Sequence, residues 1–307
     1  MDADDNPCVS YYDSTNGDLK FAKWASTEWH LETVDSGGNV GWYSSLAIDS
    51  TGNPCISYFD STNYDLKLAK WIGTEWEILA VDSEGDVGKY SSLALDSNDN
   101  PYISYYDETN GDLKFAQWTG SGWLIEIVDE TGDVGEYTSL ALDSNNNPYV
   151  SYRDVTNADL KLAQWKDATW SIEIVDSVGD VGVSSSLALN SAGLPLISYS
   201  DLTTVDLKIA EWTGTSWHIQ TVDSEGLIGG DSSLALDSHD NPFISYYASG
   251  NADLKFAKWT GTEWSIETVE STGAVGSYSS LVLDSNDSPH ISYHDASNAD
   301  LMYVSVG

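Results

Sequence analysis

The sequence predicts an all-β propeller, and three observations lead to that prediction. One unit of 47 residues repeats along the whole chain without insertion or deletion, as the spacing of all seven prolines shows: Pro7, Pro54, Pro101, Pro148, Pro195, Pro242 and Pro289. Each unit contains short segments of alternating apolar and polar residues between turn residues, which is the pattern of β-strands. No stretch has the 3.6-residue period of an amphipathic helix. Four short strands in a repeat of this length are typical of a propeller blade.

The third unit shows the predicted elements in order. Its four predicted strands are residues 92–96, 102–107, 112–118 and 123–128. Between them lie clusters of Asn, Asp, Gly, Ser and Pro, the residues that favour tight turns. A longer connection, residues 129–138, then leads to the next unit and carries Gly132 and Gly135. Glycine at these places is expected to supply a positive φ angle or to permit a close backbone approach.

The two ends of the chain bear on the number of blades. The second and third strands of the unit occur seven times, whereas the first and fourth occur six times. Seven antiparallel blades are therefore favoured, with incomplete first and last blades, and a six-bladed ring with a spare hairpin is the alternative. We expect residues 1–307 to form a single domain. The incomplete blades would leave strand edges open, and open edges accept further strands, so a homo-oligomer joined through these edges is one hypothesis.

The charge of the chain restricts its partners. With 49 acidic and 12 basic residues, the formal net charge is -37, which disfavours nucleic acid because binding to phosphates needs clustered Lys and Arg. No apolar run approaches the ~20 residues of a membrane span, so membrane insertion is not expected. Carboxylate oxygens suit Ca²⁺, and Asp107 and Asp112, at the two ends of one turn, are the candidate ligands. No other cofactor is predicted.

Aromatic residues and lysines supply the other candidate site residues. Twelve of the 13 tryptophans form six pairs around the turn between the third and fourth strands. Such pairs pack across a hairpin, and they could also serve as platforms for sugar rings. The predicted ligand-binding residues are Trp24, Trp71, Trp118, Trp165, Trp212 and Trp259, with Tyr43, Tyr90, Tyr137 and Tyr278 near the first strands and Lys20, Lys67 and Lys114 on the third. The alternative interpretation of these residues is purely structural.

The repetition of polar residues is taken as an argument against catalysis. A hydrolase needs one singular constellation of groups, whereas nearly every polar residue here recurs in each unit. The departures from the repeat are Arg153, Ser200, Asp231, Ala248 and His294, which are spread over several units. We therefore expect a protein that is not an enzyme, with a hydrolase as a less favoured alternative.

A resemblance to a known family adds to this interpretation. Residues 103–123, Ile-Ser-Tyr-Tyr-Asp-Glu-Thr-Asn-Gly-Asp-Leu-Lys-Phe-Ala-Gln-Trp-Thr-Gly-Ser-Gly-Trp, resemble the repeats of bacterial and fungal propeller lectins, including the fucose-binding group. The resemblance implies one sugar site in each groove between blades. The sequence thus predicts a non-catalytic, multivalent binding module for glycans or other cell-surface ligands, located outside the cell or on its surface. The alternative is a structural building block that assembles through its open blade edges.

Overall fold

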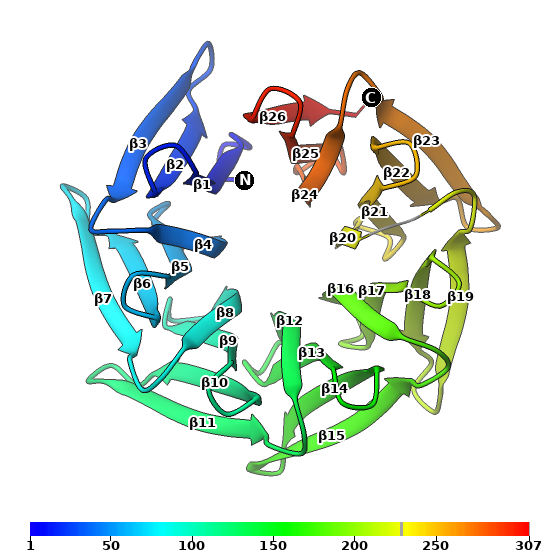
Figure 1. Ribbon diagram of the computed structural model, residues 1–307, viewed down its shortest axis with the longest axis horizontal. Coiled ribbons are helices and arrows are strands. Elements are labelled where there is room, and N and C mark those ends of the chain that lie inside the picture. The colour runs from blue at the N-terminus through cyan, green and yellow to red at the C-terminus, as the bar shows by residue number, and fades with distance from the viewer. Residues whose placement is uncertain (228–229, 307) are drawn as a thin grey trace. The chain divides into compact units, whose positions relative to one another are not determined.

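The computed structural model describes residues 1–227 and 230–306 and confirms an all-β propeller with seven blades (Figure 1). Five blades are four-stranded sheets, and the first and last blades have three strands each. Neighbouring strands of a blade pair antiparallel, as in β9 with β10. The six-bladed alternative is therefore wrong. Within the described residues, no helix has the length and hydrophobicity that a membrane span requires.

The strands follow one another in chain order through the blades. Blade 1 contains β1 (Cys8–Asp13), β2 (Asp18–Trp24) and β3 (Trp29–Asp35). Blade 2 contains β4 (Val40–Ile48), β5 (Pro54–Asp60), β6 (Asp65–Trp71) and β7 (Trp76–Asp82). Blade 3 contains β8 (Val87–Leu95), β9 (Pro101–Asp107), β10 (Asp112–Trp118) and β11 (Trp123–Asp129). Blade 4 contains β12 (Val134–Leu142), β13 (Pro148–Asp154), β14 (Asp159–Lys166) and β15 (Thr169–Asp176). Blade 5 contains β16 (Val181–Leu189), β17 (Pro195–Asp201), β18 (Asp206–Trp212) and β19 (Trp217–Asp223). Blade 6 contains β20 (Gly230–Leu236), β21 (Pro242–Ala248), β22 (Asp253–Trp259) and β23 (Trp264–Glu270). Blade 7 contains β24 (Val275–Leu283), β25 (Pro289–Asp295) and β26 (Asp300–Ser305).

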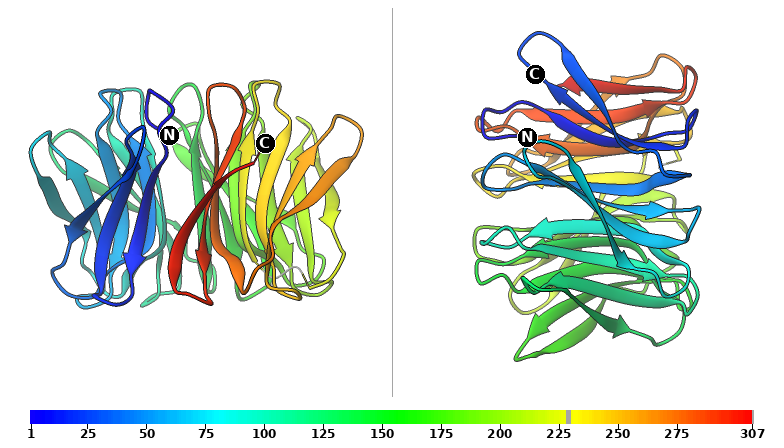
Figure 2. Two further views of the ribbon diagram at one scale, coloured as in Figure 1. Left: turned by 90° about the horizontal axis from the view of Figure 1, so that it is seen from above. Right: turned by 90° about the vertical axis from the view of Figure 1, so that its left-hand side faces the viewer.

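The chain divides into two compact units. The first comprises Met1–Val150, Asp154–Thr156 and Ala163–Ile172, and the second comprises Ser151–Arg153, Asn157–Leu162 and the residues from Glu173 onward. In the first unit strand β8 contacts both β4 and β12, and in the second unit β20 contacts both β16 and β24. Within each unit the tight turns lie at the two ends of the strands (Figure 2). The prediction of a single domain over residues 1–307 stays a prediction.

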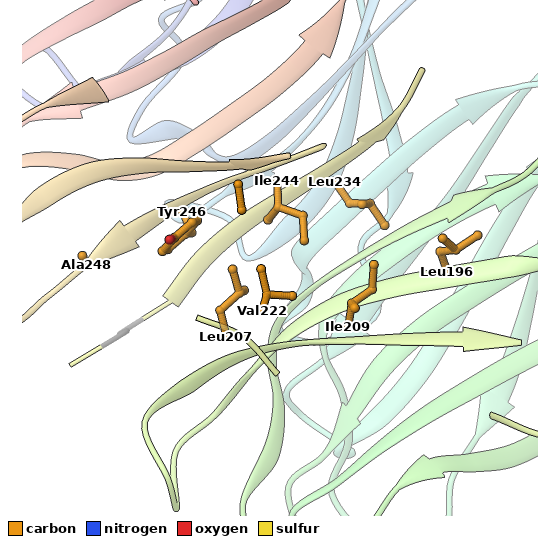
Figure 3. Packing of buried hydrophobic residues seen from close by; sticks show 9 residues of the cluster. Leu196, Leu207, Ile209, Val222, Leu234, Ile244, Tyr246 and Ala248 are labelled. Carbon is orange, nitrogen blue, oxygen red and sulfur yellow. The ribbon is translucent and has the colours of Figure 1, made fainter. Parts of the chain in front are cut away.

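Apolar side chains fill the space between neighbouring blades. In the second unit, Leu207, Ile209 and Val222 of blade 5 pack with Ile244 and Tyr246 of blade 6 (Figure 3). Burying each such side chain contributes about 1.5–3 kcal/mol. The second strand of a blade is covered on both faces, and every residue of β5, β9 and β17 is buried. The blades of a unit are therefore held together by packing of their sheet faces.

The first strand of each complete blade begins earlier than the sequence predicts. Strand β8 spans Val87–Leu95 rather than residues 92–96, and the connection predicted at 129–138 shrinks to residues 130–133 between β11 and β12. A bulge hides these strands in the sequence: Tyr90 and Tyr137 have φ angles of 54° and 53°, and the shift in register interrupts the alternation of side chains. Gly135 lies inside β12, where a Cβ atom would come 2.9 Å from the Leu113 Cα. This glycine permits a close backbone approach.

Candidate functional site

A groove between blades 5 and 6 is the candidate functional site, and both of these blades belong to the second unit. Its cavity has a volume of about 150 Å³. A cavity of roughly this volume accommodates one six-membered ring. The lining residues come from both blades and are Leu196, Ile209, Glu211, Gln220, Asp240, Asn241, Pro242, Trp259 and Trp264.

Two indole rings form one wall of the groove. Trp259 ends β22 and Trp264 begins β23, and the two residues face each other across the strands. Their ring centroids lie 5.5 Å apart at an interplanar angle of 60°. Nearly the same geometry recurs in the Trp24–Trp29 and Trp118–Trp123 pairs. The pairs therefore stabilise the hairpins, as the structural interpretation expects, and the pair of blade 6 also lines a cavity.

Three polar groups at the groove lack hydrogen-bond partners among residues 1–227 and 230–306. The Trp264 Nε1 atom is buried and has no acceptor there. The side chains of Glu211, from β18, and Gln220, from β19, line the groove without a hydrogen bond or ion pair to any described residue. Glu211 and Gln220 are half-buried, so solvent reaches them, whereas the Trp264 Nε1, like the Trp217 Nε1, is a buried donor without a partner among the described residues. Buried polar groups in proteins are nearly always satisfied, so such a donor calls for an explanation, for example a ligand or bound water.

The remaining polar residues of the groove are already engaged. Both carboxylate oxygens of Asp240 accept hydrogen bonds from Ser191, from its backbone N–H at 2.8 Å and its hydroxyl at 2.5 Å. The Asn241 side-chain amide donates to the Asp237 carboxylate at 2.9 Å. These two residues shape the rim, and Glu211, Gln220 and Trp264 supply the available hydrogen-bonding capacity.

The groove between blades 3 and 4 satisfies the corresponding groups internally. There the Trp170 Nε1 donates to Glu126 Oε2 at 3.3 Å, and the Gln117 side chain donates to the Tyr102 hydroxyl at 2.6 Å. Glu126, Gln117 and Tyr102 correspond, each two repeats earlier, to Gln220, Glu211 and Leu196 of blade 5. Glu211 and Gln220 were not among the residues predicted from the sequence, although each differs from the residues at the equivalent position of other units.

The three predicted lysines lie in ion pairs. Lys114 is buried, with its Nζ 2.6 Å from Asp82 Oδ2 and 3.4 Å from Asp107 Oδ2. Lys67 lies 2.7 Å from Asp60 and 3.6 Å from Asp35. Lys20 donates a hydrogen bond to the Thr33 hydroxyl at 2.8 Å and lies 3.8 Å from Asp13. These contacts join strands within and between blades, and a role of the lysines in ligand binding stays a prediction.

The predicted tyrosines lie at the bulges of the first strands. In the first unit the ring of Tyr90 lies 4.6 Å from the rings of both Tyr43 and Tyr137. In the second unit Ser184 and Asp231 hold the equivalent positions, and Tyr278 is 76% exposed. The six predicted tryptophans are all partly buried at the ends of third strands, and of these Trp259 lines the groove. Ligand binding by the other members of these sets stays a prediction.

The predicted calcium ligands face each other across one hairpin. Asp107 and Asp112 are paired residues of β9 and β10. The Asp107 carboxylate accepts a hydrogen bond from the Asn110 side chain at 2.9 Å and also lies near Lys114. Burial, and then the charge of Asp107, raise the pKa of Asp112. No cluster of three or more His, Cys, Asp or Glu side chains suited to a metal occurs in the described part of the chain, and calcium binding stays a prediction.

Comparison with known proteins identifies the fold. No protein-family model matches the chain, and no curated protein matches its sequence. Among solved structures, an ulvan lyase of polysaccharide lyase family PL25, bound to -[GlcA(1-4)Rha3S]-, is similar with a TM-score of 0.67 and 13% identity, over 98% of this chain and 89% of that one. A Hadza microbial sialidase, Hz136, is similar with a TM-score of 0.59 and 12% identity, over 94% of this chain and 73% of that one. At these identities the similarity shows a shared fold.

These comparisons overturn the expectation that the chain is not an enzyme. The lyase and the sialidase have the same fold, so a propeller of repeated blades accommodates catalysis. Repetition of polar residues along the sequence therefore does not exclude an active site. A fucose lectin from Kordia zhangzhouensis also matches, with 21% identity over 41% of this chain and 94% of that one, but at a TM-score of 0.33.

Proposed function

We propose that the chain binds glycans in the groove between blades 5 and 6. The observation that carries the proposal is the buried Trp264 indole N–H without an acceptor among the described residues, in a cavity of about 150 Å³. A pyranose ring carries oxygen atoms that accept such a hydrogen bond and hydroxyls that donate to a carboxylate or amide. Its C–H face packs against an indole. Glu211, Gln220 and the two tryptophans supply each of these contacts.

The other grooves can contribute to binding more weakly. Their tryptophan pairs offer similar aromatic edges, but in the groove between blades 1 and 2 the Trp76 indole already donates to Glu32 at 3.1 Å. Several weak sites on one chain increase the avidity for a repetitive polysaccharide when they engage it together. Two proteins with this fold are described as a polysaccharide lyase and a sialidase, which supports a glycan as the ligand. We place this binding outside the cell or at its surface.

Replacing Gln220 with glutamate tests the proposal. The substitution places a carboxylate where Glu126 accepts a hydrogen bond from Trp170 in another groove. The new carboxylate should accept a hydrogen bond from the Trp264 indole, which is then no longer available to donate to the ligand. A lost hydrogen bond is worth about 0.5–1.5 kcal/mol, and we therefore expect neutral sugars to bind roughly 2–10-fold more weakly. Tryptophan fluorescence titration with glucose, galactose, mannose, fucose and N-acetylglucosamine measures the change.

The matched control is Leu79→Glu, the same position in the groove between blades 2 and 3. This variant should bind with unchanged affinity at the groove between blades 5 and 6. The proposal is wrong if no neutral sugar gives a saturable response, or if Gln220→Glu binds as tightly as the parent chain.

Self-assembly through open edges is a second candidate function that we propose. Strands β1 and β26 lie at the edges of their sheets, and Leu301 and Met302 of β26 are each 38% exposed. Exposed edges accept further strands, and lysine on an edge opposes this. Met302→Lys restores the residue that the other six repeats carry and should reduce concentration-dependent association in sedimentation velocity. A parent chain that sediments as a monomer at every concentration would contradict this function.

A further inference from the structure

The charged residues that line the groove between blades 5 and 6 are all acidic. Its lining contains the carboxylates of Glu211 and Asp240 and neither Lys nor Arg. The lysines of the two blades are engaged elsewhere: Lys208 lies 2.6 Å from Asp201, Lys255 lies 2.8 Å from Asp223, and the Lys258 ammonium lies over the Phe243 ring. The formal net charge of the chain, -37, adds to the negative potential. An anion entering this groove therefore meets charges of its own sign.

The residue at the position of Glu211 differs among the blades. The equivalent residues are Lys23, Lys70, Gln117, Gln164 and Lys258. Where lysine occurs, the surrounding structure accepts it: Lys23 pairs with Asp2 at 2.9 Å, and Lys258 stacks on an aromatic ring. The same strand position thus tolerates a cation, a neutral amide or a carboxylate, and blade 5 carries the carboxylate.

We propose that Glu211 makes the groove selective for uncharged sugars and excludes acidic ones such as uronic acids. This inference rests on the proposed glycan binding and adds the class of sugar. The Glu211 carboxylate accepts hydrogen bonds from two sugar hydroxyls, while the Trp264 N–H donates to a sugar oxygen. A uronate carboxylate in the same cavity would face Glu211 within a few ångströms, where like charges repel strongly in a partly desolvated site.

Pairs of sugars that differ in one group provide the test. Glucose and glucuronate, galactose and galacturonate, and mannose and mannuronate each differ in a hydroxymethyl group against a carboxylate at C6. For at least one pair, we expect the affinity for the neutral sugar to exceed the affinity for the acid by a factor of about ten or more. A repulsion of ~1.4 kcal/mol would produce this difference. Isothermal titration calorimetry at low ionic strength measures each affinity, and added salt should narrow the gap.

Variants at the same position separate charge from shape. Glu211→Gln should reduce the ratio of the affinities for the neutral and the acidic sugar. Glu211→Lys should reverse this ratio, so that the acidic sugar binds more tightly. Lys258→Glu makes the opposite change of charge at the equivalent position of blade 6 and should leave the selectivity of this groove unchanged. Circular dichroism and thermal unfolding check that each variant folds, as the natural lysines at this position lead us to expect.

The outcomes distinguish this inference from the proposed function. If neutral and acidic sugars bind equally to the parent chain, or if Glu211→Lys leaves the preference unchanged, the selectivity is wrong and glycan binding stands. If neither member of any pair binds, glycan binding at this groove is wrong, and the selectivity with it.

Discussion

Replacing Asp82 with alanine is expected to lower the free energy of unfolding by about 3 kcal/mol, because it removes the nearer of the two carboxylates that pair with a buried ammonium and leaves only Asp107, 3.4 Å away. Asp82 ends β7 of blade 2, and its Oδ2 lies 2.6 Å from the Lys114 Nζ of blade 3. The Tyr105 hydroxyl donates to the same oxygen at 2.7 Å. All three residues are buried, so water cannot replace the lost acceptor. Urea or guanidinium denaturation followed by tryptophan fluorescence measures the loss.

Two further variants isolate the cause of this loss. Glu84 is an exposed acid two residues along the chain, and Glu84→Ala should change the unfolding free energy by no more than about 0.5 kcal/mol. Adding Lys114→Met to Asp82→Ala removes the buried ammonium and should recover part of the stability, but not all of it, because the buried Asp107 then loses its own ion pair with Lys114. An Asp82→Ala chain as stable as Glu84→Ala would show that the pair contributes nothing.

Lowering the pH should remove the stability that the Asp82–Lys114 ion pair contributes. Burial opposes ionisation of Asp82, but the bonds from Lys114 and Tyr105 outweigh burial and hold the pKa of Asp82 below its usual range. Burial likewise opposes the charge of Lys114, yet the contact with Asp82 raises its pKa. The Asp82 contribution is therefore present above its unfolded pKa of about 3.9 and is lost as the pH falls through the lower folded value. The stability difference between the parent chain and Asp82→Ala should stay constant from about pH 6 to pH 9 and shrink below about pH 4.

The sequence predicts what the blades share better than what distinguishes them. Strand β10, Asp112–Trp118, has the predicted bounds, because alternating residues and flanking turns occur in every copy. Strand β8 was predicted too short because a left-handed residue, Tyr90, breaks the alternation, and no local pattern reveals a bulge at a tyrosine. The buried position of Lys114 also escaped prediction, because its partner Asp82 lies in the preceding blade.

The candidate site was harder to predict for a related reason. The tryptophan pairs were evident because they recur, but their neighbours in space come from the adjacent blade, about one repeat away in sequence. The Trp264 indole N–H lacks an acceptor among the described residues, and Gln220, 44 positions earlier, stands where Glu126 accepts from Trp170. A consensus of the repeats averages out such differences. A comparison of each copy with the others, combined with the packing of blade 5 on blade 6, reveals them.

Gly88→Ala should be the other severely destabilising substitution, with an expected loss of about 2–6 kcal/mol in unfolding free energy. Gly88 lies in β8 with a φ angle of +106°, where an L residue is strained by about 1–3 kcal/mol. A Cβ atom there would lie 2.8 Å from both the Cα and the Cβ of Leu66 and 3.1 Å from its backbone nitrogen. Overpacking of this kind typically costs about 1–3 kcal/mol more, since backbone atoms of a buried strand cannot move aside freely.

Gly52→Ala separates the two contributions to this loss. Gly52 has a similar φ angle of +86°, but no atom lies within 4 Å of its Cβ position. This control should therefore show the backbone strain alone, about 1–3 kcal/mol, and thermal or chemical unfolding of both variants gives the cost of crowding by difference. Equal losses in the two variants would mean that β8 shifts away from Leu66 without cost. A larger loss for Gly88→Ala indicates that the close approach of strand β8 to β6 fixes how blade 3 packs on blade 2, since Leu66 belongs to blade 2.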